Sequence, residues 1–351
     1  MATMQQVADR AGVSIATVSF VVNGTKHISA STKERVLRAI DELGFEPSPI
    51  ARALASRRTQ VIAMLIPLAE RDFNSFVTGA VTAAAERGYK LILWPIGEDP
   101  RREVSTLIAS RMADGVLLLE VQLDDERVDR LVELGSEFAL IGRTRDPTPH
   151  TYVDIDFESA TESAVDHLVQ LGHSDIALVT QSFDIPSFVN YAPPIRVAET
   201  FTAIAESRGV AHGIFAAEGD PGVGRRLASQ IFSERPDTTA IVVMNNDVTF
   251  GLVSGLGRLG KEVPRDVSIV SLATSDRMAS LSDPQLTRLV AKGDELGRSA
   301  ALALIDRLND PTSAPIHELI ACDFREGEST GPPPPRRTGR PTSRKVVPAA
   351  G

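Results

Sequence analysis

The chain has 351 residues, of which 42% are hydrophobic, and its formal net charge is −9. This length exceeds one ordinary compact domain, and the apolar content excludes a wholly disordered chain. The single cysteine, Cys322, excludes an intrachain disulfide and favours a reducing compartment. The apolar runs of the chain are too short for a membrane span, and the polar start "MATMQQVADR" is unlike a signal peptide. We therefore expect a soluble cytoplasmic protein of two or three domains.

The charge is unevenly distributed. Residues 1–59 hold eight Lys and Arg against five Asp and Glu, and residues 331–351 hold five basic residues and no acidic one. The intervening body therefore carries a net charge of −17. Basic ends on an acidic body predict that only the ends meet polyanions such as DNA.

The first 45 residues predict three helices. Thr3 can cap a helix over residues 4–11, Gly12 suits a tight turn, and Ser14 can cap the second helix. The third is predicted to begin at "STKE", with Ser31 and Glu34 as a capping box. Its buried residues would follow helical spacing, and Gly44 would end it. These are Val36, Leu37, Ile40 and Leu43.

From Val61 onward, short apolar segments alternate with helical ones, which predicts parallel, doubly wound sheets in two lobes. The candidate strands are "VIAMLI", "KLILWP", "GVLLLEV", "FALIG", "YVDI", "IALVT", "GIFAA", "AIVVMN", "VSIVSL" and "HELIACDF". The predicted domains are a helical region over residues 2–46, a hinge over 47–59, a two-lobed domain over 60–330 and a disordered Pro/Arg-rich tail over 331–351. The hinge "EPSPIARALASRRT" has two prolines before one possible short helix.

Five segments in this order resemble the LacI (lac repressor) family of bacterial transcription regulators over residues 2 to about 330. They are "VADRAGVSIATVSFVVNG", "STKERVLRAIDELGFEPSPIARALASRRT", "HLVQLGHSDIALVT", "NNDVTFGLVSGLGRLGKEVPRDVSIV" and "DELGRSAALALI". The resemblance implies a helix-turn-helix headpiece, a hinge helix and two lobes similar to periplasmic sugar-binding proteins. It also implies a homodimer that binds a palindromic operator and responds to a small effector in the cleft between the lobes.

The second helix has the composition expected of a recognition helix. Its outward residues are small or hydroxylated and can approach base edges closely, whereas Val18, Val21 and Val22 can pack behind it. Basic residues nearby, Lys26, Arg52, Arg57 and Arg58, would attract phosphates independently of sequence. The candidate DNA contacts are Ile15, Ala16, Thr17, Ser19, Phe20, Asn23, Lys26, Arg52 and Leu54. The alternative is a small helical bundle that binds protein.

Two of these candidates have competing interpretations. Phe20 stands where many relatives have a polar or basic side chain, so it offers apolar contact, for example with a thymine methyl, or belongs to the headpiece core. Leu54 matches the family's hinge leucine, which wedges into the minor groove at the operator centre. Its alternative is packing against Ile50 and Ala53.

The resemblance also implies effector contacts at Phe73, Arg196, Asn246 and Asp247. A planar guanidinium suits carboxylates or sugar hydroxyls, and the Asn–Asp pair follows a strand at its carboxyl end. The structural alternatives are a core position for Phe73, an ion pair for Arg196 and helix caps for Asn246 and Asp247. Relatives often have an Asp where Ala273 stands, with Asp276 the nearest acid here, and a glutamine where Ala291 stands. These departures weaken the case for a simple sugar and leave a larger or less polar effector, or none, open.

Other motifs do not support catalysis. "GLGRLG" fits the dinucleotide fingerprint, but we expect it to close a helix, with Gly260 as its C-cap, instead of opening one. The six histidines lack metal spacing, and "DID" at 154–156 is interpreted as a strand end before a helix cap. The tail "RRTGRPTSRK" resembles a single AT-hook, but one copy is a weak signal and a solvated basic tail is the favoured interpretation. The tail has no leucine heptad, which favours a dimer over a tetramer.

The sequence thus predicts a transcription regulator, a repressor, with no enzymatic activity, cofactor or metal, and no contact with a membrane. One alternative is a regulator of the same fold that is ligand-independent or controlled by a protein partner. A solute-binding protein is the other, and the headpiece argues against it.

Overall fold

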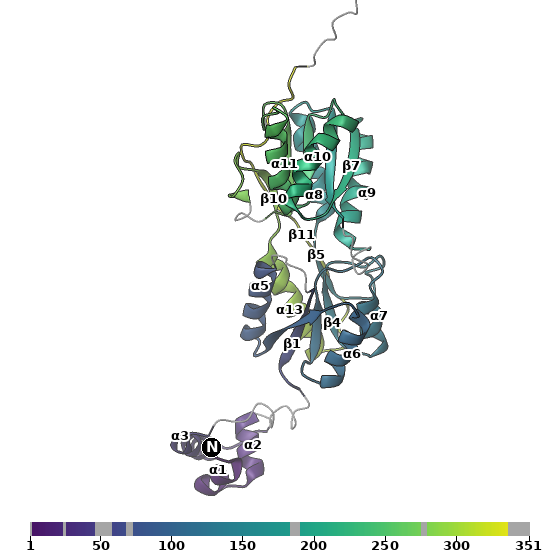
Figure 1. Ribbon diagram of the computed structural model, residues 1–351. Coiled ribbons are helices and arrows are strands. Elements are labelled where there is room, and N and C mark those ends of the chain that lie inside the picture. The colour runs from purple at the N-terminus through teal and green to yellow at the C-terminus, as the bar shows by residue number, and fades with distance from the viewer. Residues whose placement is uncertain are drawn as a thin grey trace, which may run out of the picture. The chain divides into compact units, whose positions relative to one another are not determined.

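The computed structural model describes residues 2–23, 26–45, 58–67, 73–182, 190–274 and 279–335, and the chain forms two compact units (Figure 1). Unit 1 comprises residues 1–119, 126–141 and 297–316. Unit 2 comprises residues 120–125, 142–296 and 317–351. Each unit is therefore assembled from segments that are distant in the sequence, and each is described by itself.

Three helices form the headpiece at the start of unit 1: α1 (Met4–Ala11), α2 (Ile15–Asn23) and α3 (Ala30–Leu43). Thr3 and Gln6 cap α1 reciprocally, and Gly12 ends it at φ 63°, a backbone conformation that favours glycine. The Ser14 hydroxyl accepts a hydrogen bond from the Thr17 amide (3.2 Å), as a cap for α2 should. The predicted cap of α3 is wrong by two residues, because Ser29, not Ser31, accepts from the Thr32 amide.

The headpiece core is small and apolar. It consists of Val7, Ala8, Ala11, Val18, Val36, Ala39 and Phe45, with Val21, Val22 and Ile40 among the half-buried side chains packed against it. The predicted burial of Leu37 and Leu43 is wrong, since they are 45% and 36% exposed. Val36, Ala39 and Ile40 face the core at helical spacing, so the helical period was predicted correctly while Leu37 and Leu43 lie beside the buried face.

The rest of unit 1 has an α/β pattern. Its strands are β1 (Val61–Pro67), β2 (Lys90–Ile96), β3 (Gly115–Leu118) and β4 (Phe138–Ile141). Its helices are α5 (Asn74–Glu86), α6 (Pro100–Ser110), α7 (Glu126–Glu133) and most of α13 (Gly293–Asn309). Strands β1 and β3 are almost wholly buried, which explains their continuous apolar sequences.

Unit 2 repeats this pattern. Its strands are β5 (Tyr152–Ile155), β6 (Asp175–Gln181), β7 (Ala211–Ala217), β8 (Ala240–Val243), β9 (Ser268–Leu272), β10 (Thr287–Val290), β11 (His317–Ile320) and β12 (Asp323–Arg325). Its helices are α8 (Phe157–Gln170), α9 (Ala192–Ser207), α10 (Pro221–Glu234) and α11 (Asn246–Arg258).

The strands form two six-stranded sheets, in the orders β11-β5-β4-β3-β1-β2 and β12-β10-β9-β8-β6-β7. Strand β1 lies between β2 and β3 and is parallel to both, with Ile62 opposite Leu91 and Gly115, whereas β12 is antiparallel to β10. Strand order that jumps between non-consecutive strands is typical of a doubly wound sheet. The predicted fold class is therefore confirmed.

The second sheet shows how helices cover it. Alternate residues of a strand face opposite sides, and one set, including Val179, Ile241, Val243 and Ile269, forms a core cluster with α10 and α11. The neighbouring helices α8 and α9 contact β6 to β10 instead (Figure 1).

Two strand predictions are corrected. "HELIACDF" is not one strand, because β11 pairs with β5 in the first sheet and β12 pairs with β10 in the second. Strand β10 was not among the predicted strands, since "TRLV" is short and begins with polar residues that the fold buries. A four-residue strand gives a weak pattern in a sequence.

Candidate DNA-binding and effector sites

The outer face of α2 presents a compact group of small side chains. Val18 anchors the helix in the headpiece core, leaving Ile15 44% exposed and Ala16 exposed beside it. Thr17 and Ser19 are half-buried, and the Thr17 hydroxyl lies 2.9 Å from that of Ser14. This surface can approach base edges closely because no long side chain stands in front of it.

Phe20 is half-buried and does not belong to the headpiece core cluster of the described residues. The Lys26 ammonium lies 5.5 Å from the centre of its ring, within the range of a cation–π contact. The two candidates therefore lie together, with an apolar face beside a positive charge. Asn23 ends α2, but its side chain lies outside the described part of the chain, as do Arg52, Leu54 and Arg57.

Some basic residues near the N-terminus already have partners. Arg10 pairs with Glu42 at 2.6 Å and Arg38 with Glu34 at 3.0 Å. Arg58 donates to the Leu308 carbonyl and to the Asn309 side chain (2.9 Å), at the C-terminal end of α13. The prediction that Arg58 serves phosphates is therefore not supported, because its guanidinium stabilises a helix end in unit 1.

The effector candidates are divided between the two units. Phe73 lies in unit 1 at the N-cap position of α5, half-buried, and makes no side-chain cap. Arg196 on α9, and Asn246 and Asp247 at the start of α11, lie in unit 2.

Arg196 belongs to a polar cluster that the sequence analysis did not identify. Its Nη2 donates to the Thr144 carbonyl at 2.8 Å, and its Nη1 lies 3.8 Å from Glu158, while its buried Nε has no hydrogen-bond partner among the described residues. Arg143 holds Asp154 at 2.8 Å and Glu158 at 2.9 Å. The acids and Arg143 thus neutralise one another, and Arg196 keeps donor capacity for a further acceptor.

Burial dominates the electrostatics of this cluster. It raises the pKa of Asp154, against the opposing effect of Arg143. Burial, followed by the charge of Arg143, lowers the pKa of Arg196 from its ordinary value. Although burial alone would lower the pKa of Arg143, its hydrogen bond and charge interaction with Asp154, together with Glu158, raise it. Arg196 is still a cation at neutral pH, because an arginine pKa starts above about 12.

The start of α11 carries a second polar group. Asn245, not Asn246 or Asp247, caps the helix by accepting from the Val248 amide (3.2 Å), so the capping alternative for the predicted pair is wrong. Asn246 Oδ1 accepts a hydrogen bond from Thr274 at 2.7 Å, and Asp247 is exposed. Thr274 follows β9, in the segment where relatives have a carboxylate.

Ala273 has a positive φ of 53°, which is uncommon for a residue with a side chain. Asp276 lies outside the described residues. Thr274 is a described polar residue just after β9, and its hydroxyl forms a hydrogen bond with that of Ser271 within the strand. The sequence did not indicate Arg143, Asp154 and Thr274 as site residues, because the effector candidates were chosen by resemblance at single positions. Their location within or just after predicted strands was the signal that could have pointed to them.

The features set aside are explained structurally. "GLGRLG" begins within α11 and runs past its end at Arg258. The C-cap is Leu259, one residue earlier than the predicted Gly260, which follows at φ 69°. The Asp156 side chain caps α8 by accepting from the Ser159 amide at 2.9 Å, as expected for "DID". Among the described residues, no cluster of three His, Cys, Asp or Glu could hold a metal ion. In the same part of the chain, every helix is too short or too polar to cross a membrane.

Comparison with known proteins agrees with this arrangement. Residues 3–48 match the model of bacterial regulatory proteins of the lacI family, and residues 165–330 match the periplasmic binding protein-like domain. The HTH-type transcriptional regulator CelR of Thermobifida fusca is 29% identical over 337 residues, covering 93% of this chain and 98% of its own.

Two solved structures resemble the whole fold. A transcriptional regulator CelR–cellobiose complex has a TM-score of 0.70 and 26% identity, covering 94% of this chain and 100% of that one. The lac repressor dimer bound to operator and the anti-inducer ONPF has a TM-score of 0.80 and 22% identity, covering 94% and 99%.

A helix-turn-helix headpiece followed by two doubly wound units defines a DNA-binding transcription regulator. The chain carries the DNA-binding domain of the lacI family of bacterial regulatory proteins and a periplasmic binding protein-like domain.

Proposed function

We propose that this regulator is a cytoplasmic repressor without enzymatic activity, which binds a palindromic operator as a homodimer and is controlled by a small molecule. Named relatives are transcriptional regulators, and one solved neighbour is a dimer on its operator. A two-fold symmetric dimer matches a palindromic site because each headpiece reads one half.

The observation that carries the DNA-binding role is the exposed outer face of α2. Ile15, Ala16, Thr17 and Ser19 would contact bases or phosphates, with Phe20 against a thymine methyl and Lys26 on the backbone. We assign Asn23, Arg52 and Leu54 to the same interface, with Leu54 as a minor-groove wedge at a pyrimidine–purine step.

We assign effector recognition to Phe73, Arg196, Asn246 and Asp247. The unpartnered Nε of Arg196 supports this assignment, because a buried donor without an acceptor is costly unless a ligand satisfies it. The ligand would carry a carbonyl, carboxylate or hydroxyl oxygen toward Arg196. The CelR–cellobiose complex makes a carbohydrate-related effector a reasonable first class to test.

Selection from a random duplex pool tests the regulator, by comparing the full chain with one that lacks residues 1–59. We expect a palindrome with a central pyrimidine–purine step that is lost on truncation. If binding is only A·T-rich, strongly salt-sensitive and retained after truncation, the basic C-terminal tail dominates and the proposal fails.

A second candidate is a ligand-independent or protein-partnered regulator of the same fold. Ala273 and Ala291 favour it, since neither offers a polar side chain to a ligand. A thermal-shift screen of mono- and disaccharides and nucleobases separates the two candidates. A ligand that raises the melting temperature of the wild type but not of Arg196→Met supports effector control, and a screen with no such ligand supports the second candidate.

A further inference from the structure

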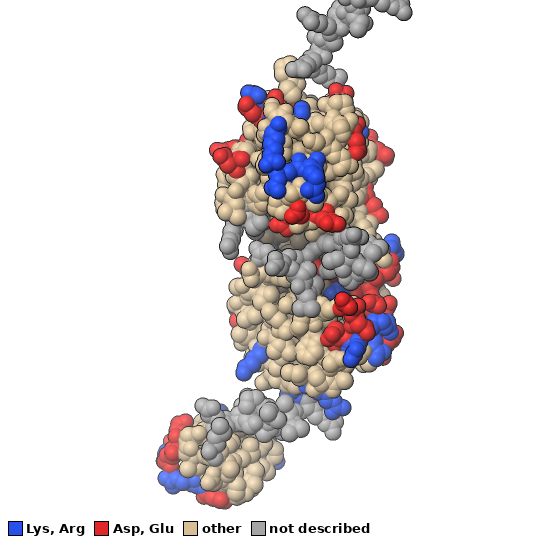
Figure 2. All heavy atoms as spheres, in the orientation of Figure 1, with Lys and Arg blue, Asp and Glu red and all other residues tan. Residues whose placement is uncertain are grey.

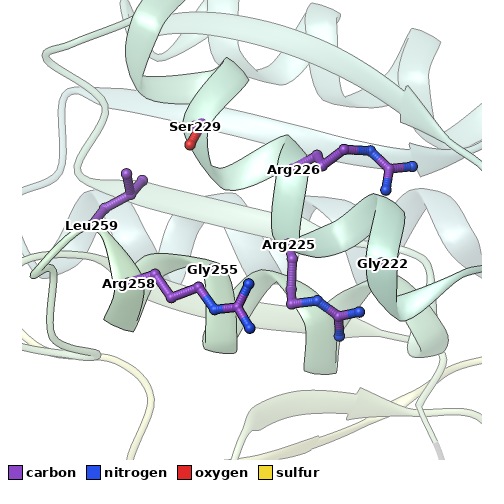
Figure 3. Close-up of a pocket in the computed structure, with 7 residues that line it drawn as sticks. All are labelled: Gly222, Arg225, Arg226, Ser229, Gly255, Arg258 and Leu259. Carbon is purple, nitrogen blue, oxygen red and sulfur yellow. The ribbon is translucent and has the colours of Figure 1, made fainter.

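Three exposed arginines gather on one face of unit 2, outside the sites described above. Arg225 and Arg226 lie on α10 and Arg258 ends α11. Figure 2 shows basic side chains concentrated on this face of the unit, and Figure 3 shows Arg258 extending toward Arg225 from the neighbouring helix. Because the protein as a whole is acidic, such a concentration of positive charge is a local feature.

Glycines bring the two helix backbones together beneath these arginines. A Cβ on Gly251 would lie 1.9 Å from the Pro221 carbonyl oxygen, and one on Gly255 would lie 2.6 Å from that of Arg225. No side chain therefore fits between the helices at these points, and the arginines are held on closely packed, regular elements. A rigid base reduces the entropy lost when side chains bind a ligand.

The arginines border a pocket of about 350 Å³. A Cβ on Gly222 would lie 2.7 Å from Asp220 Oδ1, 3.4 Å from Arg225 Nη2 and 3.6 Å from Arg226 Nη1, so two guanidinium groups and one carboxylate border the space above this glycine. The Ser229 hydroxyl and the 42% exposed side chain of Leu259 complete the wall. This volume is at the lower end of the range for small-molecule sites.

The positive charge of the pocket is not neutralised from within the described structure. Among the described residues, no acidic side chain forms an ion pair with Arg225, Arg226 or Arg258, whereas Arg208 and Arg298 have such partners. The nearest carboxylate is Asp220, which accepts from the Val223 amide at 2.8 Å as the cap of α10. Three arginines beside one carboxylate, which already accepts the helix-capping hydrogen bond, give the pocket a net positive charge.

We propose that this α10–α11 pocket binds a small phosphorylated molecule, with the phosphate on Arg225, Arg226 and Arg258. Guanidinium forks bind phosphate oxygens in pairs and are always charged, which suits a dianionic phosphate ester. Ser229 supplies a further hydroxyl, and Leu259 contacts the uncharged body of the ligand. Such a site would give the regulator a second chemical input, independent of the effector residues assigned above.

Calorimetric titration of the full-length protein with phenyl phosphate at low salt tests the site, with phenol as the uncharged probe. The variant Arg225→Gln/Arg226→Gln/Arg258→Gln removes the three charges. A matched variant, Arg35→Gln/Arg102→Gln/Arg111→Gln, removes the same charge from other exposed arginines that form no ion pair with a described acidic residue. Circular dichroism melts confirm that both variants fold.

We expect phenyl phosphate to bind the wild type and the matched variant within about twofold, and the pocket variant at least about tenfold more weakly, since charge-assisted hydrogen bonds are lost. Added salt should weaken binding and phenol should not bind. Equal affinity of the two variants would overturn the proposal. A second outcome would also overturn it: the pocket variant binds phenyl phosphate as the wild type does, but sediments as a monomer where the wild type is a dimer. The arginines would then bind a second copy of the chain instead of a phosphate.

Discussion

On α2 of the headpiece the candidate DNA-binding side chains stand at the surface, whereas in unit 2 the candidate effector arginine lies among partly buried charges. The α2 face rests on one apolar core, with Val18 wholly buried behind it. Arg196 instead rests on a network in which Arg143 joins Asp154 and Glu158. In the proposed function, DNA recognition would depend on packing behind an exposed surface, and effector recognition would depend on a balance of buried charge.

The largest expected effect is on the headpiece core. Val18→Asp buries an unpaired carboxylate in a core of few residues and should destabilise the headpiece by about 3 kcal/mol or more. We expect loss of specific DNA binding in fluorescence anisotropy while the melting of the α/β units stays unchanged. Leu37→Asp is the control, since this side chain is 45% exposed on α3. Equal damage from both variants would mean that the core is placed incorrectly.

The buried charge network of unit 2 should be the next most sensitive. Arg143→Met leaves Asp154, only 5% exposed, without its partner, and we expect a loss of about 3–5 kcal/mol in the free energy of unfolding. Arg145→Met removes an exposed pair with Asp124 and should leave the free energy of unfolding almost unchanged, because water screens both charges. Urea unfolding measures both. Similar losses in the free energy of unfolding for the two variants would show that the buried ion pairs of Arg143 contribute no more to stability than the exposed pair of Arg145.

Adding a methyl group to glycines of α11 should have a smaller effect on stability, and its sign should depend on whether the glycine packs against α10. Gly251→Ala places a methyl group against the Pro221 carbonyl and should destabilise unit 2 by about 1–3 kcal/mol. Gly257→Ala meets no atom within 4 Å and should stabilise the same helix by up to about 1 kcal/mol. Thermal melts distinguish them. Two changes of the same sign would contradict the helix contact.

The pH dependence of unit 2 should show the smallest effect. Burial lowers the pKa of His173, whose Nε2 donates to the Gly331 carbonyl at 2.9 Å and whose Nδ1 accepts from Thr239. Because the folded state binds this proton less readily than the unfolded state, stability is full above the unfolded pKa of about 6.5 and falls as the pH drops below it.

Urea titrations above and below that pH should give a loss of at most about 1.4 kcal/mol per pH unit from this residue. The loss should shrink in His173→Gln and persist in His27→Gln, which changes an exposed headpiece histidine. If the change of stability with pH is the same in His173→Gln as in the wild type, another residue causes the pH dependence.

The sequence predicted the headpiece better than the effector region, for a physical reason. Helix caps, Gly12 and Gly44 act within a few residues, so the three helices were found, although Ser29 replaced Ser31 as a cap. The buried strands were found because continuous apolar runs are local as well. Strand β10 and the division of "HELIACDF" into two strands were missed, because they depend on which sheet each strand joins and no local pattern indicates that.

The cluster around Arg196 required the same long-range information. Arg143 follows β4, Asp154 lies in β5 and Glu158 in the first turn of α8, and only the fold brings them to Arg196 on α9. The predicted tail over 331–351 was also defined by composition alone. Its first residue, Gly331, bonds through its amide and carbonyl to Ser268 and His173.

Reading of bases by the exposed face of α2 is the central claim, and exchanging one of its side chains tests it most directly. Phe20→Arg places a bidentate donor where the wild type has a half-buried ring, and the headpiece core is untouched. Selection from a random duplex pool should return a palindrome that differs from the wild-type site at one symmetric pair of positions, with guanine newly preferred there. An unchanged selected sequence from a folded Phe20→Arg protein would contradict the account.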